Sequence, residues 1–282
     1  MHAPKEDAGL ALGFVGETLI MISDKMKELC ARIRSLGSAV VAFSGGVDSA
    51  VLAKIAHEEL GNNMAAVTGE SASVPSRDIA SAKDFCKKHG IPHVIVRTCE
   101  FDDPLYKSNP ENRCFYCKGE LFETLAVTAK EKGLKYVIEG TNSSELKGHR
   151  PGFEAAKVNP IVTTPFADAC ITKEEVREIA RALGLDLAER PSTACLSSRV
   201  PTGTALTEEL LKRIDDAENF LLSIGVRQIR LRHHGDLARI ESDEEGLKLC
   251  IEKKDDIVKK INGLGWKNVT LDLKGYRTGG GM

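Results

Sequence analysis

Apolar and polar residues follow two different periods along the first two thirds of the chain. Short apolar runs of strand length occur at 39–43, 64–68, 93–98 and 136–139, and amphipathic stretches with helical spacing occur at 48–60, 77–89, 117–132 and 172–183. Apolar strands separated by amphipathic helices are typical of a parallel sheet that helices cover on both faces. The pattern therefore predicts an α/β domain with a doubly wound parallel sheet.

Local signals mark several of the helix ends. Thr172 stands three residues before Glu175, which is the spacing of a capping box at a helix start. Gly90, Gly133 and Gly184 follow the ends of predicted helices, where a left-handed residue closes the last turn. We expect helices to begin and end near these positions.

The pattern changes after residue 203. A helix is predicted over 206–224, two alternating strands over 227–242 with a turn at 234–236, a helix over 244–261 and a strand over 268–273. An α-β-β-α-β order does not extend a parallel sheet, which needs crossover connections. We therefore expect two domains, residues 1–203 and residues 204–282, of which the second is a small α+β domain.

One strand-to-helix corner is crowded with small and polar residues. It is made of Ser44, Gly45, Gly46, Val47, Asp48 and Ser49. The glycines let backbone N–H groups converge on one anion at the helix N-terminus, the serines add hydroxyl donors, and the aspartate offers a carboxylate to Mg²⁺. A tight turn alone would need one glycine and would not explain the rest. The corner predicts a phosphate site, although neither Walker A nor G-x-G-x-x-G is present.

The charge balance and the N-terminal sequence limit the partners. A formal net charge of -2 argues against a protein-wide attraction to nucleic acid or to anionic membranes. The apolar run at 8–22 is interrupted by Glu17 and lacks a small-residue cleavage pattern, so it fits neither a signal peptide nor a membrane span. We expect a cytoplasmic protein, in which the eight cysteines stay mostly reduced.

Three of the cysteines stand in polar segments that are suited to chemistry. Cys114 and Cys117 are separated by two residues at a helix start, and Cys195 lies in a later loop. Basic residues flank them at Arg113, Lys118 and Arg199, and nearby cations are expected to lower the pKa of a thiol. The other five are expected to be packing residues: Cys30, Cys86, Cys99, Cys170 and Cys250.

The number of thiols decides between metal sites. Three thiolates suit a [4Fe–4S] cluster with one open iron, whereas four would suit a closed cluster or a structural zinc. A zinc ion completed by His149 or His233 is the alternative, and a purely structural role for the three cysteines is a third reading.

The segment SGGVDS at 44–49 resembles the signature of the PP-loop ATP pyrophosphatases, which split ATP between the α- and β-phosphates and adenylate an acceptor oxygen. The resemblance implies that this loop holds the pyrophosphate and that Thr68 lies near the adenosine. It also extends to the segment 139–145, with Gly140 and Thr141, and we expect Arg150 to reach ATP or the substrate.

Further segments are similar to the LarE sulfur transferases from about residue 20 onward, among them NRCFYCKGELF, GHRPGFEAA, RPSTACLSSRVPTGT and LDLKGYRTG. The resemblance implies ATP-dependent replacement of oxygen by sulfur in pyridinium-3,5-biscarboxylic acid mononucleotide, a step in the biosynthesis of the nickel-pincer nucleotide. In some members a single cysteine at the position of Cys195 gives up its sulfur. The presence of Cys114 and Cys117 resembles the subgroup in which three cysteines hold a [4Fe–4S] cluster that delivers an extra sulfide repeatedly.

Arg230, Arg232 and His234 alternate along a predicted strand and would share one face. The two arginines match the substrate-phosphate arginines of the family, with Lys118 and Arg199 as further substrate contacts, although a solvated strand face would show the same alternation. Two acidic positions are weaker candidates, Glu218 and Glu241.

The expected mechanism has three steps. Mg-ATP binds at residues 44–49, a substrate carboxylate attacks the α-phosphate, and cluster-bound sulfide expels AMP from the acyl adenylate. It requires the phosphate loop and the three thiolates to face one crevice. The expected partners are the mononucleotide, a sulfur donor and further copies of the chain, joined through the small domain. The alternatives are a tRNA 2-thiolating enzyme, sacrificial sulfur transfer from Cys195 and a non-catalytic ATP sensor.

Overall fold

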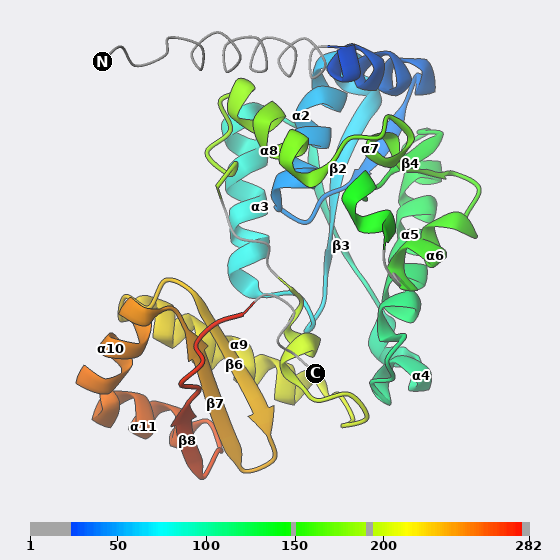
Figure 1. The fold of residues 1–282 in the computed structure, drawn as a ribbon. Coiled ribbons are helices and arrows are strands. Elements are labelled where there is room, and N and C mark those ends of the chain that lie inside the picture. The colour runs from blue at the N-terminus through cyan, green and yellow to red at the C-terminus, as the bar shows by residue number, and fades with distance from the viewer. Residues whose placement is uncertain (1–23, 148–150, 190–193, 278–282) are drawn as a thin grey trace, which may run out of the picture. The chain divides into compact units, whose positions relative to one another are not determined.

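The computed structural model describes residues 24–147, 151–189 and 194–277 (Figure 1). The chain forms two compact units, each built from several segments. The first takes the described parts of Met1–Thr68, Ala82–Ile95 and Phe122–Ser192, and the second takes those of Gly69–Ser81, Val96–Leu121 and Thr193–Met282. The domain boundary expected between residues 203 and 204 stays a prediction.

A five-stranded sheet organises the first unit. Its strands are β1 (Ala39–Ala42), β2 (Met64–Glu70), β3 (His93–Arg97), β4 (Tyr136–Ile138) and β5 (Val162–Thr163), in the order β3-β2-β1-β4-β5. The strand β1 pairs in parallel with β2 and with β4, and β4 pairs in parallel with β5. The doubly wound parallel sheet is confirmed. The sequence did not predict β5, because two residues carry no readable period.

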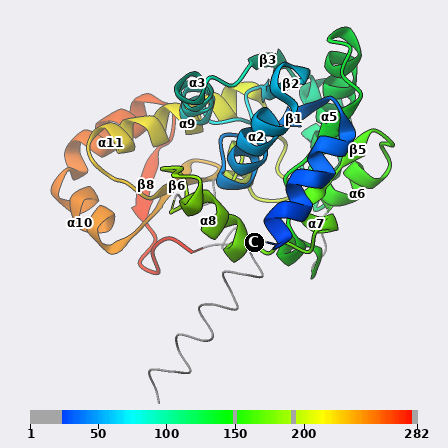
Figure 2. The ribbon, with the colours of Figure 1, turned by 90° about the horizontal axis from the view of Figure 1, so that it is seen from above.

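Helices flank this sheet on both sides (Figures 1 and 2). They are α2 (Val47–Leu60), α3 (Ser76–His89), α5 (Arg113–Glu131), α6 (Pro151–Lys157), α7 (Pro165–Asp168) and α8 (Lys173–Ala182), and residues 24–36 are also helical. The helix predicted from Cys117 begins four residues earlier, at Arg113. A turn at 110–113 starts it, in which Arg113 N donates to Pro110 O (3.0 Å), and this turn has no apolar spacing that would reveal it.

The predicted cap of α8 is confirmed. The Thr172 hydroxyl accepts from Glu175 N (3.3 Å), and the Glu175 carboxylate accepts from Thr172 N (2.7 Å). Apolar side chains of β1, α2 and α8 form the core of the first unit, and α2 packs against α8. Because α2 is buried in this core and packs against α8, its start, which carries the serine and glycine corner, is held in a fixed position.

The second unit contains a three-stranded sheet with helices against one face. Its elements are α9 (Glu208–Ser223), β6 (Ile229–His234), β7 (Leu237–Ser242), α10 (Glu244–Glu252), α11 (Lys254–Gly263) and β8 (Asn268–Leu271). Strands β6 and β7 are antiparallel, and β7 and β8 are parallel. The single helix predicted over 244–261 is wrong. The chain breaks at Lys253, and the two short helices each turn an apolar side chain, Cys250 and Ile257, into the same core.

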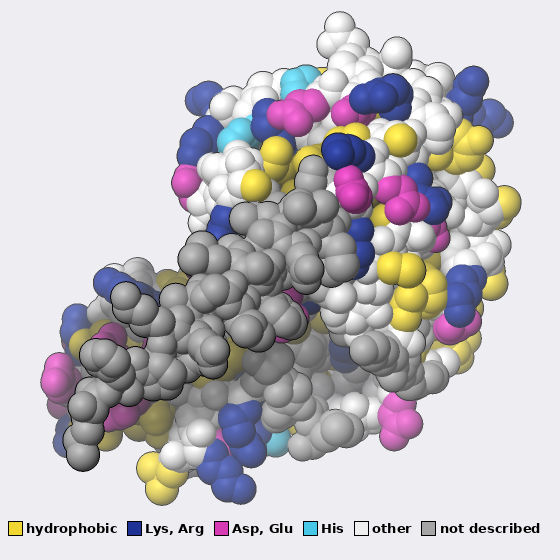
Figure 3. Space-filling view, turned by 45° about the horizontal axis from the view of Figure 1, so that its top comes forward, with side chains coloured by type: hydrophobic (Ala, Val, Ile, Leu, Met, Phe, Trp, Pro, Cys, Tyr) yellow, Lys and Arg dark blue, Asp and Glu magenta, His cyan; other side chains and the backbone are white. Residues whose placement is uncertain are grey.

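The described chain also contains the short helix α4 (Pro104–Lys107) and the 3₁₀ helices η1 (Gly61–Asn63), η2 (Glu100–Asp102), η3 (Ser143–Lys147) and η4 (Leu196–Arg199). No helix in the described part of the chain combines the length and the apolar character that crossing a bilayer requires. The apolar run at 8–22 lies outside the described residues. On the face shown in Figure 3, acidic and basic side chains are interspersed.

Candidate functional site

The phosphate corner of the first unit is shaped by its own backbone and hydroxyls. Gly45 has φ +73°, a conformation that favours glycine, and Gly46 begins α2 without a side-chain cap. Ser49 Oγ donates to Gly46 O (3.0 Å) and accepts from Ser44 N (3.2 Å). These bonds close the loop and leave the N-terminus of α2 open to an anion.

Asp48 lies where the loops after β1 and β4 meet. Its carboxylate accepts from Asn142 Nδ2 (3.1 Å) and forms an ion pair with Lys173 Nζ. A Cβ on Gly140 would lie 3.3 Å from the Asp48 Cβ, so glycine lets the two loops approach. The strand order reverses between β1 and β4, because β2 and β3 are added on one side of β1 and β4 and β5 on the other, and ligands of open α/β sheets bind outside the strand ends at such a point.

Lys173 is a candidate that the sequence analysis missed. It is the first residue of α8, and periodicity gave it no distinction from the other charged residues of that helix. Its ammonium group forms an ion pair with the Asp48 carboxylate, which is expected to bind Mg²⁺. A metal–phosphate complex that enters the loop would meet both charges at once, a carboxylate for the metal and a cation for a phosphate oxygen.

The other predicted nucleotide contacts fall at the strand ends. The Thr68 hydroxyl is buried and donates to Phe43 O (2.7 Å), with His93 Nε2 at 2.8 Å. Thr141 is buried, and its N–H donates to the Glu139 carboxylate (2.8 Å). Arg150 lies outside the described residues. The Thr68 side chain and the Thr141 main chain therefore stabilise the loops at the strand ends.

The second unit holds all three predicted cysteines. Cys114 and Cys117 stand three residues apart on α5, a spacing that puts both on one helix face, and Cys195 immediately precedes η4. The Cys195 loop is held from two sides. Leu196 N donates to Ser73 O (2.8 Å), and the Arg113 guanidinium donates to Ser197 O (3.1 Å). Contacts between distant segments thus hold the Cys195 loop in place.

The electrostatics of the thiols differ from the expectation. Burial and then the charge of Glu100 raise the pKa of Cys117, with smaller contributions in the same direction from Cys195 and Cys114. Lys118 acts the other way but does not outweigh them. The cation Lys118 therefore acts on the pKa of Cys117 in the predicted direction, but the net shift of that pKa is upward. Desolvation disfavours an isolated thiolate, and binding a metal ion would deprotonate the thiol outright.

An iron–sulfur cluster at these cysteines stays a prediction. The thiols of Cys114, Cys117 and Cys195 are soft ligands. Burial lowers the pKa of the Arg113 guanidinium, but the charges of Cys195 and Cys114 act in the opposite direction, and the net shift of this pKa is upward. In the described ranges no group of three or more His, Cys, Asp or Glu side chains could hold a metal ion. For the zinc alternative, His149 lies outside the described residues, and His233 Nδ1 accepts from Trp266 Nε1 (3.1 Å).

The remaining cysteines divide into two groups. Cys86 and Cys250 are buried, and burial raises their pKa to about 12 and about 11. Cys30 is half-buried against the core of the first unit. The packing role predicted for Cys99 and Cys170 is wrong, since both are exposed. They follow β3 and α7 in connecting segments.

Arginine and glutamate pairs surround the Cys195 loop in the second unit. Arg199 is buried and donates to both Glu218 oxygens (2.9 and 3.2 Å) and to Cys195 O (3.0 Å). Glu218 is fully buried and also accepts from Arg77 (2.7 Å). These cations hold the pKa of Glu218 below its usual range despite burial. The weak candidate Glu218 is therefore the centre of a buried charge network.

The cationic face of β6 is buried and not solvated. Arg230 and Arg232 are 7% and 3% exposed, so the solvated-face reading is wrong for both. Arg232 donates to Glu241 (3.1 Å) and to Ser198 O (2.6 Å), while its Nη2 is buried without a hydrogen-bond partner among the described residues. Arg230 lies over the Tyr276 ring (4.7 Å). Buried guanidinium groups with unused donors suit an anionic ligand.

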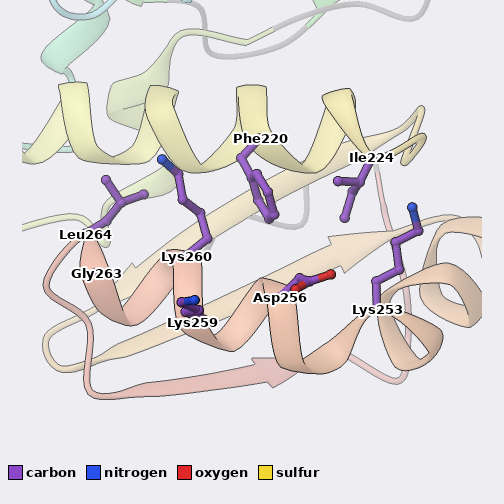
Figure 4. Close-up of a pocket in the computed structure, with 8 residues that line it drawn as sticks. All are labelled: Phe220, Ile224, Lys253, Asp256, Lys259, Lys260, Gly263 and Leu264. Carbon is purple, nitrogen blue, oxygen red and sulfur yellow. The ribbon is translucent and has the colours of Figure 1, made fainter.

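A pocket of about 450 Å³ lies elsewhere in the second unit, between α9 and α11 (Figure 4). Its lining combines apolar side chains such as Phe220 and Leu264 with Lys253, Lys259 and Lys260. None of the residues predicted for nucleotide, metal or substrate lines it.

Comparisons with known proteins cover most of the chain. A sequence profile of the NAD synthase family matches residues 20–111. An uncharacterized protein of Synechocystis is 40% identical over 261 residues, which are 92% of this chain and 97% of that protein. Pyridinium-3,5-bisthiocarboxylic acid mononucleotide synthase of Lactiplantibacillus plantarum is 30% identical over 92% of this chain and 94% of its own. A tRNA-specific 2-thiouridylase of Rickettsia africae is 30% identical over 55% of this chain and 52% of its own.

Proposed function

Since the chain belongs to the LarE family, that of pyridinium-3,5-bisthiocarboxylic acid mononucleotide synthase, we propose that it inserts sulfur into pyridinium-3,5-biscarboxylic acid mononucleotide. It is an ATP-dependent sulfur transferase. The reaction would activate a carboxylate of the substrate by adenylation and replace a carboxylate oxygen by sulfur, as a step toward the nickel-pincer nucleotide.

The residues of the first unit would perform the activation. The N–H groups at the start of α2 and the hydroxyls of Ser44 and Ser49 would bind the departing pyrophosphate. Asp48 would take Mg²⁺ and release Lys173, which would then neutralise a phosphate oxygen. Charge that develops on the leaving group would thus be met by donors already in place, which is how preorganised sites lower an activation barrier.

The residues of the second unit would perform the sulfur transfer. Cys114, Cys117 and Cys195 would hold a [4Fe–4S] cluster, which when bound supplies sulfide as the nucleophile. Arg113 and Lys118 would balance the negative charge that three thiolates bring to this region. Arg199 fixes the Cys195 backbone and would keep that thiol oriented.

The buried arginines of β6 would bind the phosphate of the mononucleotide. Arg232 has an unused buried donor, and the Arg230 guanidinium forms no ion pair within the described chain. Glu241 compensates the charge of Arg232, so the face keeps a net positive charge for a phosphate dianion. The proposal requires one substrate molecule to meet both these arginines and the thiols of the second unit.

The proposal rests on one observation: the loop that carries Cys195 is hydrogen-bonded to Arg199 and Arg232, two arginines expected to bind the substrate. The main-chain carbonyl of Cys195 accepts from Arg199, and that of Ser198, three residues later, accepts from Arg232. A substrate phosphate on this arginine face would therefore be held by side chains that also fix the thiol loop. Such coupling would orient the carboxylate toward the sulfur.

The test combines three measurements on anaerobically prepared protein. Pyrophosphate release should depend on the mononucleotide, whereas an ATP sensor would release none. Iron content should fall in Cys117→Ala, and equal iron in both proteins would refute the ligand set. The intact mass after turnover should be unchanged, because loss of one H₂S from Cys195 would show sacrificial transfer.

The tRNA 2-thiolating alternative is tested with the same assay. Its substrate is a base in RNA, whose recognition calls for basic and aromatic surface, and the chain has a net charge of -2 with 5% aromatic residues. Thiolation of transfer RNA in place of the mononucleotide would decide for it. Homo-oligomerisation through the small domain and a cytoplasmic location stay predictions.

A further inference from the structure

The pocket between α9 and α11 combines an apolar wall with cations. Figure 4 shows Phe220 pointing from α9 toward α11, with Lys260 on one side of its ring and Lys253 on the other. Phe220, Ile224 and Leu264 pack against the core of the second unit, so the apolar part of the lining is held in place. The pocket volume of about 450 Å³ lies within the range of about 300–1,000 Å³ in which small-molecule sites fall. The pocket is therefore large enough for a small ligand with an apolar body.

The lysines of this pocket gather along α11 without ion-pair partners. Lys253 immediately precedes the helix, and Lys260 follows it by seven residues, or two helical turns, so both lie on one side of α11. None of the three lining lysines forms an ion pair within the described residues. Other lysines of the second unit have a carboxylate partner: Lys212 with Asp216, Lys248 with Glu244 and Lys267 with Asp236.

The charges of the lining favour an anionic ligand. Three lysines and Asp256 give the described lining a net charge of +2. Like charges gathered at one pocket repel one another, and a bound anion would relieve that repulsion. A phosphate monoester carries a charge of about −1.5 to −2 at pH 7, and lysine is a common ligand of phosphate. Charge complementarity therefore points to a phosphate monoester.

The rest of the lining selects the body of that ligand. An aromatic ring such as Phe220 binds the flat face of a nucleobase by stacking, whichever base it is. The Asp256 carboxylate offers hydrogen-bond acceptors to hydroxyl groups of a sugar. Base, sugar and phosphate together make a nucleoside monophosphate.

We propose that the pocket between α9 and α11 is a second nucleotide site and that it binds a nucleoside monophosphate. The base stacks on Phe220, and the phosphate binds Lys259 and Lys260, which are neighbours at one end of the pocket (Figure 4). Lys253, at the other end, donates a hydrogen bond to the base. The pocket shares no residue with the phosphate loop at 44–49, so this inference does not depend on the sulfur transfer proposed above.

The test follows the methyl group of Ile224, which lines the pocket, by NMR spectroscopy. The full chain is labelled at its isoleucine δ1-methyl groups, and Ile224→Val identifies the signal. The protein is titrated with AMP, with adenosine, which lacks the phosphate, and with ribose 5-phosphate, which lacks the base. A signal from the pocket itself distinguishes binding there from binding of AMP at residues 44–49.

Two variants test the lysines in the same titration. Lys260→Met removes a lining cation, and the matched control Lys254→Met removes the cation of an exposed residue on the same helix that does not line the pocket. Methionine keeps the length of the side chain and a high helix propensity, so both variants should fold like the wild type.

AMP should shift the Ile224 signal until it saturates. The Kd for AMP should rise about tenfold in Lys260→Met and stay unchanged in Lys254→Met, and adenosine and ribose 5-phosphate should each bind at least about tenfold more weakly than AMP. An Ile224 signal that AMP leaves in place would overturn the site. Equal affinity for AMP and ribose 5-phosphate would refute stacking on Phe220, and equal affinity for AMP and adenosine would refute the role of the lysines. A signal that moves with protein concentration alone would show that a second copy of the chain covers the pocket, and this too would contradict the proposal.

Discussion

The phosphate loop and the thiol–arginine region are built in different ways. The loop is a single run of six residues, 44–49, closed by hydrogen bonds between its own members and carried by one buried helix. The thiol–arginine region draws on segments around residues 73, 100, 114, 195 and 230, which are far apart in sequence. One site is local in the chain, and the other is assembled by tertiary contacts.

The two regions also manage charge differently. The loop uses backbone N–H groups at a helix N-terminus, where the dipole supplies partial positive charge without any buried ion. The second region buries whole guanidinium groups, each beside a carboxylate: Arg199 beside Glu218 and Arg232 beside Glu241. A buried pair is sensitive to removal of one partner. We therefore expect a substitution in the second region to reduce the stability of the protein, and a substitution at the phosphate loop to reduce its catalytic activity.

The largest effect is expected for Glu218→Gln. The change leaves Arg199 and Arg77 without their buried carboxylate and should destabilise the protein by about 3–5 kcal/mol. The lowered pKa of Glu218 agrees with a strongly stabilised anion. Urea unfolding measures the effect, with Glu245→Gln as the exposed control on α10. If Glu218→Gln and Glu245→Gln lost the same free energy of unfolding, the stability of the second region would not depend on its buried ion pairs.

Lys173→Met should reduce activation without unfolding the protein. It removes the cation beside Asp48, and loss of one preorganised group of this kind lowers kcat/KM for ATP by about 100-fold. Pyrophosphate release measures the rate. Lys54→Met is the matched control, because Lys54 lies on α2 and forms an ion pair with Glu58 on the same helix (2.8 Å). A stability loss comparable to that of Glu218→Gln would mean that the first site also depends on a structural ion pair.

Arg230→Lys tests the phosphate role of β6 with a smaller change. Arg230 stacks on Tyr276 and forms no ion pair within the described residues. Its replacement therefore leaves no carboxylate without an ion-pair partner. Lysine lacks the planar fork that binds a phosphate through two donors, and KM for the mononucleotide should rise about tenfold. The KM for ATP should stay unchanged. Equal rises for both substrates would contradict a specific role in binding the mononucleotide.

The contrast also explains how much the sequence revealed. The parallel sheet and the capping box at Thr172 follow from local spacing, and the structure has them at the expected positions. The phosphate role of residues 44–49 also follows from local spacing and stays a prediction. The grouping of Cys114, Cys117 and Cys195 could be expected from their polar surroundings. Their electrostatics could not, because the burial of Cys117 and the charge of Glu100 arise only when distant segments pack.

The residues that the sequence did not reveal are those whose role depends on a partner elsewhere in the chain. Lys173 is one of several charged residues at the start of α8, and only folding places it against Asp48. Glu100 lies in a short 3₁₀ helix with no period to read. The break at Lys253 was missed because the apolar spacing before and after it is compatible with one continuous helix.

The smallest effect is expected for Glu175→Gln at the cap of α8. Glutamine also completes a capping box, so the change isolates the charge that Lys25 contacts at 2.7 Å. Although burial opposes it, the hydrogen bonds from Lys25 and Thr172 lower the pKa of Glu175 from its ordinary 4.5. A lowered folded-state pKa gives stability that is present above the unfolded value and is lost as pH falls through the folded value. The wild type should therefore exceed the variant by about 1 kcal/mol at pH 7, and the difference should shrink below pH about 4.5. Urea unfolding at several pH values measures it, with the exposed Glu174→Gln as control. A difference that persisted in acid would trace the effect to packing and not to charge.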